Sequence, residues 1–216
     1  VASRCGRAKK LMGNLLAEKN RWEEQSASFH EQTMCVMGDC LLAAAFLAYI
    51  GYFDEQHRRH IILPDWQDIV DSCGISFRRE MSLVEYLSLP EQRMDWSAKK
   101  LPQDQLCIEN AIMLERFHRY PLVVDPSGQA VEFLLANLQA KKIVKTSFVE
   151  KGFMKQLENA VRFGYPILVQ DAEFMDPVMN PILNHEVRRV GGRQLVRLGP
   201  NDVDVSPSFT LYLSTR

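Results

Sequence analysis

The sequence predicts an α/β protein in which a parallel sheet with crossover helices follows a long helical segment. Between residues 120 and 171, short apolar, β-branched runs alternate with helical periods, which is typical of a parallel sheet. Residues 1–119 instead indicate helices joined by short connections. The sheet is therefore expected in the second half of the chain.

Composition limits the classes of partner. The chain has 216 residues, 46% of them apolar, so a substantial core is possible. It carries 26 Lys and Arg against 27 Asp and Glu, a formal net charge of -1. This balance gives no global reason to expect nucleic acid or an anionic membrane as partner. The mean hydropathy of -0.19 argues against a polytopic membrane protein.

The first 32 residues are polar and contain no proline, and a stripe of apolar residues recurs every seven positions. A spacing of seven fits a helix packed against one partner helix. An ordinary amphipathic surface helix explains the same pattern and stays open as an alternative. The stripe consists of Leu15, Trp22, Phe29 and Val36.

A continuous apolar run covers residues 40–53 and begins directly after Asp39. A membrane span needs about 20 residues, so the run is too short for one. It predicts a helix buried on most sides inside a protein. Further on, short helices are expected near 65–72, 80–88 and 107–118, and the stretch from Pro90 to Gln105 is expected to form a surface loop.

The second half of the chain supplies strands and crossover helices in turn. The final strand, 209–215, follows a hairpin signal, because Gly191-Gly192 separates two alternating runs. The earlier strands are expected at 120–125, 143–148 and 165–171, and the helices between them at 129–140 and 154–163.

The turn after the first strand is the position where a P-loop would bind phosphates. Gly128 can serve as the last loop glycine, but Gln129 then takes the lysine position and Ala130 the Ser/Thr position. The first glycine would fall at Val123, inside the strand, so the loop is too short. A plain strand-to-helix turn, with Gly128 supplying backbone freedom, explains the segment better. The residues of this degenerate loop are Ser127, Gly128, Gln129 and Ala130.

The end of the third strand carries a degenerate acidic pair. Asp171 could hold magnesium in an ATPase, but Ala172 stands at the usual position of the catalytic Glu, and Glu173 comes one residue later. The five cysteines match no zinc or CxxC spacing, which favours reduced thiols. We therefore expect no catalytic residue, no bound cofactor and no metal site in this segment.

The chain as a whole resembles the motor region of cytoplasmic dynein heavy chains, at the fifth of its six AAA+ modules. The resemblance is collinear over essentially all residues, and DPSGQA and GYFD favour the cytoplasmic over the axonemal type. It is carried by GDCLLAAAFLAYIGYFD at 38–54, LCIENAIMLERFHRYPLVVDPSGQA at 106–130, NPILNHEVRRVGGR at 180–193 and DVDVSPSFTLYLSTR at 202–216.

The resemblance implies a role for each part. Residues 1–32 would be the base of the returning helix of the antiparallel stalk coiled coil, 33–119 the helical connecting part of the AAA+ large subdomain, and 120–216 its α/β core. The hairpin would be an insertion before the sensor-1 strand 209–215, which should lie between the first and third strands. The chain is expected to be a segment of a longer protein, with the rest of the module after Arg216.

The implied function is that of a ring module that binds no nucleotide and relays conformational change between the ATPase ring and the stalk. The parent chain would be an ATP-hydrolysing, minus-end-directed microtubule motor of intracellular transport, in the cytoplasm and on the cytoskeleton. ATP and magnesium would bind in other modules. The expected partners are neighbouring modules, the antiparallel stalk helix, microtubules through the stalk tip, and dynein accessory chains and regulators, with no nucleic acid and no membrane span.

Two alternatives stay open at the level of sequence. One is a working ATPase with an unusual P-loop, and the other is an inactive AAA+ scaffold module of another six-module ring such as midasin. The family also places an arginine that faces the fourth module's nucleotide beyond the sensor-1 strand. We do not assign that role to Arg188, Arg189 or Arg216.

Overall fold

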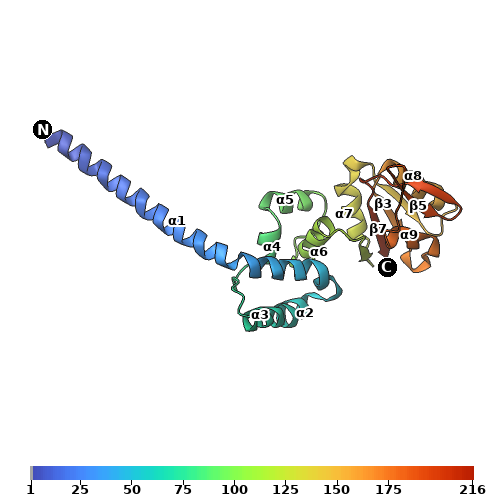
Figure 1. Ribbon diagram of the computed structural model, residues 1–216, viewed down its shortest axis with the longest axis horizontal. Coiled ribbons are helices and arrows are strands. Elements are labelled where there is room, and N and C mark those ends of the chain that lie inside the picture. The colour runs from blue at the N-terminus through green and yellow to red at the C-terminus, as the bar shows by residue number, and fades with distance from the viewer. Residues whose placement is uncertain (1) are drawn as a thin grey trace. The chain divides into compact units, whose positions relative to one another are not determined.

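A computed structural model describes residues 2–216 of the chain. The side chains that it describes are those of residues 15, 16, 18–23, 25, 26, 29 and 32–216. The chain forms two compact units, Val1–Leu87 and Ser88–Arg216 (Figure 1). The functional division of the sequence at residues 32 and 119 stays a prediction.

The first unit is helical and is dominated by α1, a single helix of 48 residues, Ala2–Tyr49. The two helices expected at 1–32 and 40–53 are therefore one continuous helix. No proline occurs before Pro64, so nothing in this stretch removes a backbone donor or forces a kink. The other elements of the unit are η1 Ile50–Tyr52, α2 Glu55–His57, the π-helix η2 Arg58–Ile62, α3 Leu63–Ser72 and α4 Leu83–Leu87.

The C-terminal third of α1 buries one face. Leu42 and Phe46, four residues apart in α1, are buried, as is Ile50 at the start of η1, whereas Leu41 and Tyr49 are exposed. The expectation that this segment is buried on most sides is therefore wrong for the chain by itself. By length and composition alone, Gln32–Tyr52 could cross a membrane, and a third of its most apolar window is buried.

The second unit begins with two helices, α5 Pro90–Ala98 and α6 Gln105–Arg116. The surface loop expected from Pro90 onward is wrong over the first nine residues. Proline is tolerated at the first position of a helix, where its missing N–H needs no partner. The Gln92 side chain also accepts a hydrogen bond from the Leu89 N–H at 2.9 Å, which satisfies one of the free donors at this helix start.

The core of the second unit is a parallel sheet of four strands in the order β1-β7-β3-β2. The expected position of the final strand, between the first and third, is confirmed: β7 pairs in parallel with both β1 and β3. The strands are β1 Leu122–Val124, β2 Val144–Ser147, β3 Ile167–Gln170 and β7 Leu211–Thr215, and the crossover helices are α7 Gln129–Asn137 and α8 Phe153–Phe163.

The two crossover helices cover opposite faces of this sheet. Leu168 of β3 packs with Leu134 of α7, in a cluster that Tyr212 of β7 also joins. The neighbouring strand residues Ile167 and Val169 pack with α8. Successive strand residues point to opposite faces, so the two clusters together form a three-layer α/β arrangement.

The hairpin at Gly191-Gly192 is confirmed and extends into a second, antiparallel sheet, β4-β5-β6. Both glycines have positive φ, 56° and 81°, as a two-residue hairpin turn requires. The third strand was not expected, because only Val203 in it is apolar and buried. The strands are β4 Arg188–Val190, β5 Arg193–Leu198 and β6 Asn201–Asp204, and the shorter helices of this unit are η3 Gln139–Lys141, η4 Ala172–Phe174, η5 Pro177–Met179 and α9 Asn180–Leu183.

Candidate functional site

The carboxyl-terminal edge of the parallel sheet is the first candidate site, because ligands of open α/β folds bind outside the carboxyl ends of the strands. Four strands end at this edge, and each ends at or beside a polar residue. Each of these residues hydrogen bonds within the chain. They are Asp125 after β1, Ser147 at the end of β2, Asp171 after β3 and Thr215 at the end of β7.

The side chain of Asp125 lies at the N-terminus of α7, which is the helix end that would face a phosphate. Its side chain is buried, and Oδ2 accepts a hydrogen bond from the Val131 N–H at 2.9 Å. Oδ1 accepts another from the Ser127 hydroxyl at 3.2 Å. A helix N-terminus attracts anions through its free N–H groups and its dipole. Here a carboxylate of the chain itself fills that role.

The other residues of the degenerate loop have backbone roles. Gly128 lies before the first residue of α7 with φ of 80°, a conformation that favours glycine. The Gln129 side chain is exposed, and its backbone N–H points to the Ser127 hydroxyl oxygen at 3.5 Å. Ala130 is half-buried. The turn therefore offers neither a cation for a triphosphate nor a hydroxyl for magnesium at these positions.

The acidic end of β3 is also engaged within the fold. Asp171 adopts φ of 58°, in the left-handed region that Asp tolerates better than most residues. Its Oδ2 accepts a hydrogen bond from the Ser147 hydroxyl of β2. Glu173 accepts a hydrogen bond from the Thr215 hydroxyl at 2.8 Å. Both acids that the sequence singled out therefore join neighbouring strand ends.

Metal and thiol chemistry have no evident centre in the described part of the chain. Among the described side chains, no group of three or more His, Cys, Asp and Glu could hold a metal ion. The four described cysteines, Cys35, Cys40, Cys73 and Cys107, are all free thiols. Burial and a hydrogen bond with Asp104 raise the pKa of Cys107 to about 11, so this thiol stays protonated at neutral pH.

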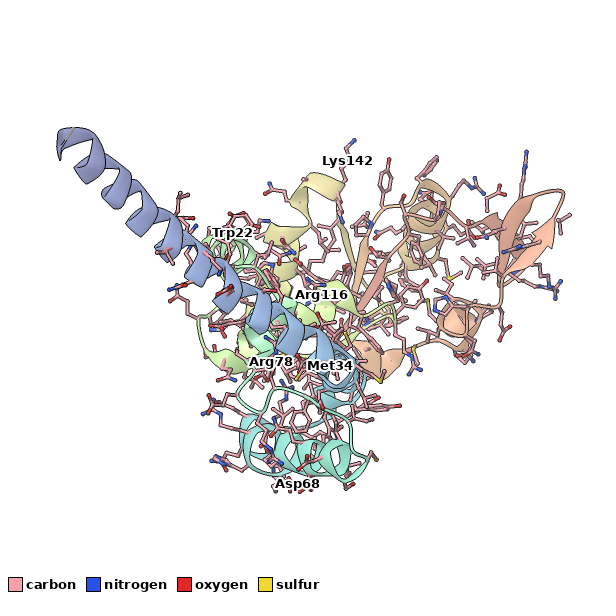
Figure 2. The ribbon with its side chains drawn as sticks, turned by 60° about the vertical axis from the view of Figure 1, so that its left-hand side comes forward. Trp22, Met34, Asp68, Arg78, Arg116 and Lys142 are labelled. Atoms are coloured by element: carbon pink, nitrogen blue, oxygen red, sulfur yellow. The ribbon has the colours of Figure 1, made fainter. Side chains whose placement is uncertain are left out.

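A second candidate site lies on α1, where the loop after α3 crosses the helix, and no local sequence pattern predicts it. Asp39 is almost fully buried, and its carboxylate accepts hydrogen bonds from the backbone N–H of Arg78 at 2.9 Å and from its Nε at 2.7 Å. Arg78 lies beside the helix (Figure 2). The available signal was Asp39 itself, an acid directly before an apolar run.

Gly38 permits this close crossing. A Cβ at this position would lie 2.4 Å from the carbonyl oxygen of Ser76 and 2.7 Å from Cβ of Phe77. The Arg78 guanidinium also lies over the Tyr86 ring, 5.8 Å from its centroid. The Tyr86 hydroxyl contacts the Cys40 thiol at 3.2 Å, and this contact raises the pKa of Tyr86. We call Gly38, Asp39, Arg78 and Tyr86 the α1 clasp.

The heptad stripe of α1 is exposed in this chain. Leu15, Trp22, Phe29 and Val36 have exposed fractions of 61%, 67%, 66% and 49%. An exposed row of large apolar side chains on one helix marks an interaction face. The stripe is therefore an exposed apolar face of α1.

Comparisons with known proteins place these two regions in one family. A family model described as the ATP-binding dynein motor region matches residues 94–216, and one described as the microtubule-binding stalk of the dynein motor matches residues 2–70. The cytoplasmic dynein heavy chain of Dictyostelium discoideum is 55% identical over 216 residues, which is 100% of this chain and 4% of that protein.

Two further relatives show whether the chain is more similar to cytoplasmic or to axonemal dynein heavy chains. The cytoplasmic dynein heavy chain of Drosophila melanogaster is 53% identical over 92% of this chain and 4% of its own length. Dynein axonemal heavy chain 2 of Mus musculus is 36% identical over 97% of this chain and 5% of its own length. The chain thus spans only a small part of these relatives, and it is more similar to these cytoplasmic heavy chains than to the axonemal one.

Proposed function

The chain belongs to the dynein motor-region family, and from this premise we propose that it is the fifth AAA+ module of a cytoplasmic dynein heavy chain with the adjoining base of its stalk. In this proposal the module binds no nucleotide and relays conformational change between the ring and the stalk. The stalk match over residues 2–70 and the whole-chain similarity to dynein heavy chains favour this over a midasin-type scaffold.

The single observation that carries the absence of nucleotide binding is the contact between Asp125 and Val131. A buried carboxylate already accepts the hydrogen bond of the N–H that would face a phosphate. A phosphate there would meet a negative charge, without the lysine that normally offsets its own charge. The neutral side chains of Gln129 and Ala130 add no compensating interaction.

The relay role rests on α1 and its clasp. One continuous helix joins the exposed stripe to the buried residues Leu42 and Phe46. The clasp fixes this helix to the loop after α3 at Gly38 and Asp39. Packed elements move as bodies and do not deform continuously, so a displacement of the loop would be passed to the stripe.

The remaining parts of the proposal concern the whole heavy chain. It would hydrolyse ATP with magnesium in other modules and move along microtubules toward their minus ends, in the cytoplasm and on the cytoskeleton. Its neighbours would be the adjacent ring modules, an antiparallel stalk helix, microtubules at the stalk tip, and accessory chains and regulators.

Nucleotide binding is tested by calorimetric titration of the chain with Mg-ATP and Mg-ADP. We expect no binding at physiological concentrations of either nucleotide. Micromolar binding of ATP that disappears on further mutation of Gln129 or Ala130 would contradict this part of the proposal.

The relay is tested in the intact heavy chain with Trp22→Ala and the control Asn20→Ala, which changes an exposed residue of the same helix off the stripe. Burying an aromatic side chain against a partner helix contributes on the order of 2–3 kcal/mol. We expect Trp22→Ala to weaken the dependence of microtubule affinity on nucleotide state and to leave basal ATP binding intact. An unchanged affinity switch in single-molecule binding measurements would count against the assignment.

A further inference from the structure

The hairpin β4–β5 concentrates positive charge without any acid of its own. Its eleven residues, from Arg188 to Leu198, include four arginines and no Asp or Glu. All four arginines are exposed, and none of them forms an ion pair in the part of the chain that the structure describes. They are Arg188, Arg189, Arg193 and Arg197.

Three of these arginines share one face of the hairpin with apolar residues. Arg188 pairs with Leu195 and Val190 with Arg193, so these residues and Arg197 point to the same side. Arg188 and Arg193 are diagonal neighbours, about 7–8 Å apart in such a ladder, and therefore repel each other. Val190, two residues from Arg188 along β4 and opposite Arg193 on β5, is 60% exposed. The face is cationic with an apolar centre.

The same strand has a free edge. β4 pairs only with β5 and ends the three-stranded sheet, so its outer backbone groups have no strand partner within the described chain. An extended peptide can add to such an edge through main-chain hydrogen bonds. The guanidinium group of an arginine can bind a carboxylate through two parallel hydrogen bonds, so nearby arginines would favour a peptide with acidic side chains.

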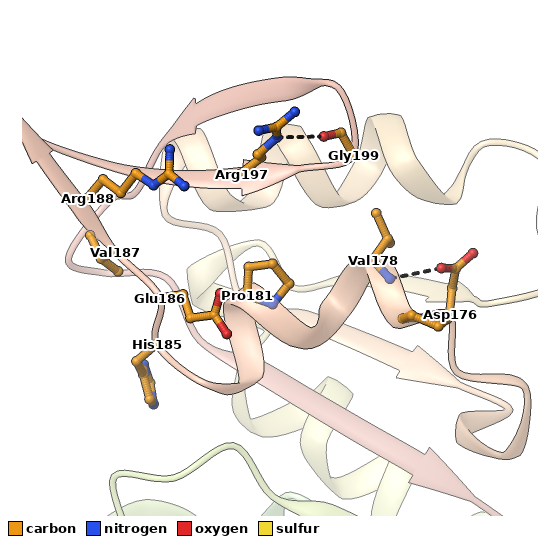
Figure 3. Close-up of a pocket in the computed structure, with 10 residues that line it drawn as sticks. Asp176, Val178, Pro181, His185, Glu186, Val187, Arg188, Arg197 and Gly199 are labelled. Carbon is orange, nitrogen blue, oxygen red and sulfur yellow. Dashed lines mark hydrogen bonds between the residues drawn. The ribbon is translucent and has the colours of Figure 1, made fainter.

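A hollow next to the hairpin extends this surface. It has a volume of about 690 Å³ and lies between the hairpin and the segment from η5 to α9 (Figure 3). Arg188 and Arg197 line it on the hairpin side, and Pro181 and Val187 contribute apolar surface. Its two acids have other roles: Asp176 accepts from the Val178 N–H at 2.9 Å, and Glu186 accepts from the Asn184 side chain at 3.1 Å.

We propose that the β4 edge and this hollow bind an acidic, extended polypeptide segment, which adds as a fourth strand. Alternate carboxylates would pair with Arg188 and Arg193, and an apolar side chain would cover Val190. A nucleic acid fits less well, because Asp202 of β6 lies opposite Arg197 in the register and would repel a continuous polyanion. This role is independent of nucleotide binding and of the relay.

The test uses a labelled peptide that repeats Glu-Ser-Val-Ser, which places glutamate and valine in turn on one face of a strand. Fluorescence anisotropy follows its binding to the chain at low and at physiological ionic strength. We expect saturable binding that weakens with added salt. Arg188→Glu and Arg193→Glu should each weaken it by about tenfold or more, as the loss of a charge-assisted hydrogen bond predicts. Lys151→Glu makes the same change of charge at an exposed turn before α8 and should leave binding unchanged.

Two further probes make the test specific. A peptide N-methylated at every residue keeps its charges but cannot donate main-chain hydrogen bonds from either edge, so it should lose most of the affinity. A single-stranded oligonucleotide serves as the polyanion control. The proposal is overturned if both arginine variants bind the peptide like the parent chain, if N-methylation has no effect, or if the oligonucleotide binds more tightly than the peptide.

Discussion

The carboxylate of Asp39 in α1 is held by Arg78, a residue 39 positions later in the chain. It accepts one hydrogen bond from the Arg78 backbone N–H at 2.9 Å and one from Nε at 2.7 Å. The Asp39 side chain is 1% exposed, whereas that of Arg78 is 42% exposed. The pair therefore joins a buried charge on the long helix to the loop that crosses it.

Replacing Arg78 by Ala should destabilise the chain by roughly 1–3 kcal/mol, because the buried carboxylate loses one of its two donors. Arg79 supplies a matched control: it pairs with Asp71, and both side chains are more than half exposed. Arg79→Ala should cost about 0–1 kcal/mol, as exposed ion pairs do. Urea unfolding of the two variants measures the difference. Equal losses of unfolding free energy in the two variants would mean that the Asp39 contact contributes no more than an exposed ion pair.

Gly38→Ala should destabilise the chain by roughly 1–3 kcal/mol, because the new Cβ meets the backbone oxygen of Ser76 at 2.4 Å and the loop must shift. Gly152 is the matched control, since a Cβ there meets its nearest atom, the Gln156 side-chain nitrogen, at 3.6 Å. Gly152→Ala should be neutral or stabilising by about 0.5 kcal/mol. Thermal unfolding, followed by circular dichroism, compares the stability of the two variants. A Gly38→Ala variant as stable as the parent chain would contradict the close crossing of the loop over α1.

Restoring the missing P-loop groups should not restore nucleotide binding. In the variant Gln129→Lys with Ala130→Thr, the Asp125 carboxylate still holds the Val131 N–H and the loop is still too short. Calorimetric titration of the variant Gln129→Lys with Ala130→Thr tests nucleotide binding, and binding of ATP by that variant would contradict the expectation.

Replacing Asp125 by Ala should destabilise the chain by roughly 1–3 kcal/mol, because it leaves the buried N–H of Val131 without a partner. Asp125→Asn keeps an acceptor and should cost less. Urea unfolding compares Asp125→Ala with Asp125→Asn.

Cys107 should react slowly with iodoacetamide. Burial is the main reason that its pKa is raised to about 11, and Asp104 adds to it, so at pH 8 only about one thiol in a thousand is ionised. Because the pKa of Cys107 is raised in the folded chain, the stability that the neutral thiol contributes is present below the unfolded pKa and is lost as the pH rises toward 11. Alkylation at pH 8 should therefore be at least about tenfold slower in the folded chain than in urea.

Asp104→Asn separates the two causes of that pKa shift. Asparagine keeps a good helix-start residue for α6, because its side-chain oxygen can still accept from the Cys107 N–H. The negative charge is gone, so the thiol pKa should fall and alkylation should become faster. An unchanged rate would mean that burial alone sets the reactivity.

Much of the sheet could be predicted from sequence, because its strands are short apolar runs separated by clear helical periods. Leu168 and Val169, for example, are buried on opposite faces and stand in one apolar run. The position of β7 between β1 and β3 came from the family resemblance, since periodicity cannot order strands. β6 was missed because a strand with one buried side chain, Val203, leaves almost no pattern.

The α1 clasp could not be predicted from local patterns. Nothing in the sequence pairs Asp39 with Arg78, because the contact depends on how the loop after α3 returns to the helix. The role of Asp125 was missed for a related reason: its acceptor geometry toward Val131 exists only once the turn has formed around Gly128. The degenerate loop itself could be predicted, because the lysine and the Ser/Thr of a P-loop stand at fixed positions after the last glycine, and Gln129 and Ala130 occupy these positions.

Phe46→Ala tests whether the buried face of α1 transmits movement in the intact motor. Phe46 is 0% exposed, so its truncation should cost roughly 3–5 kcal/mol of stability. Leu41→Ala, on the same helix but 47% exposed, should change stability by about 1 kcal/mol or less. Because hydrolysis is proposed to occur in other modules, gliding velocity should fall more than the ATPase rate in the Phe46 variant. Paired measurement of both rates decides the matter, and equal losses would mean that the helix supports the ring without a distinct relay role.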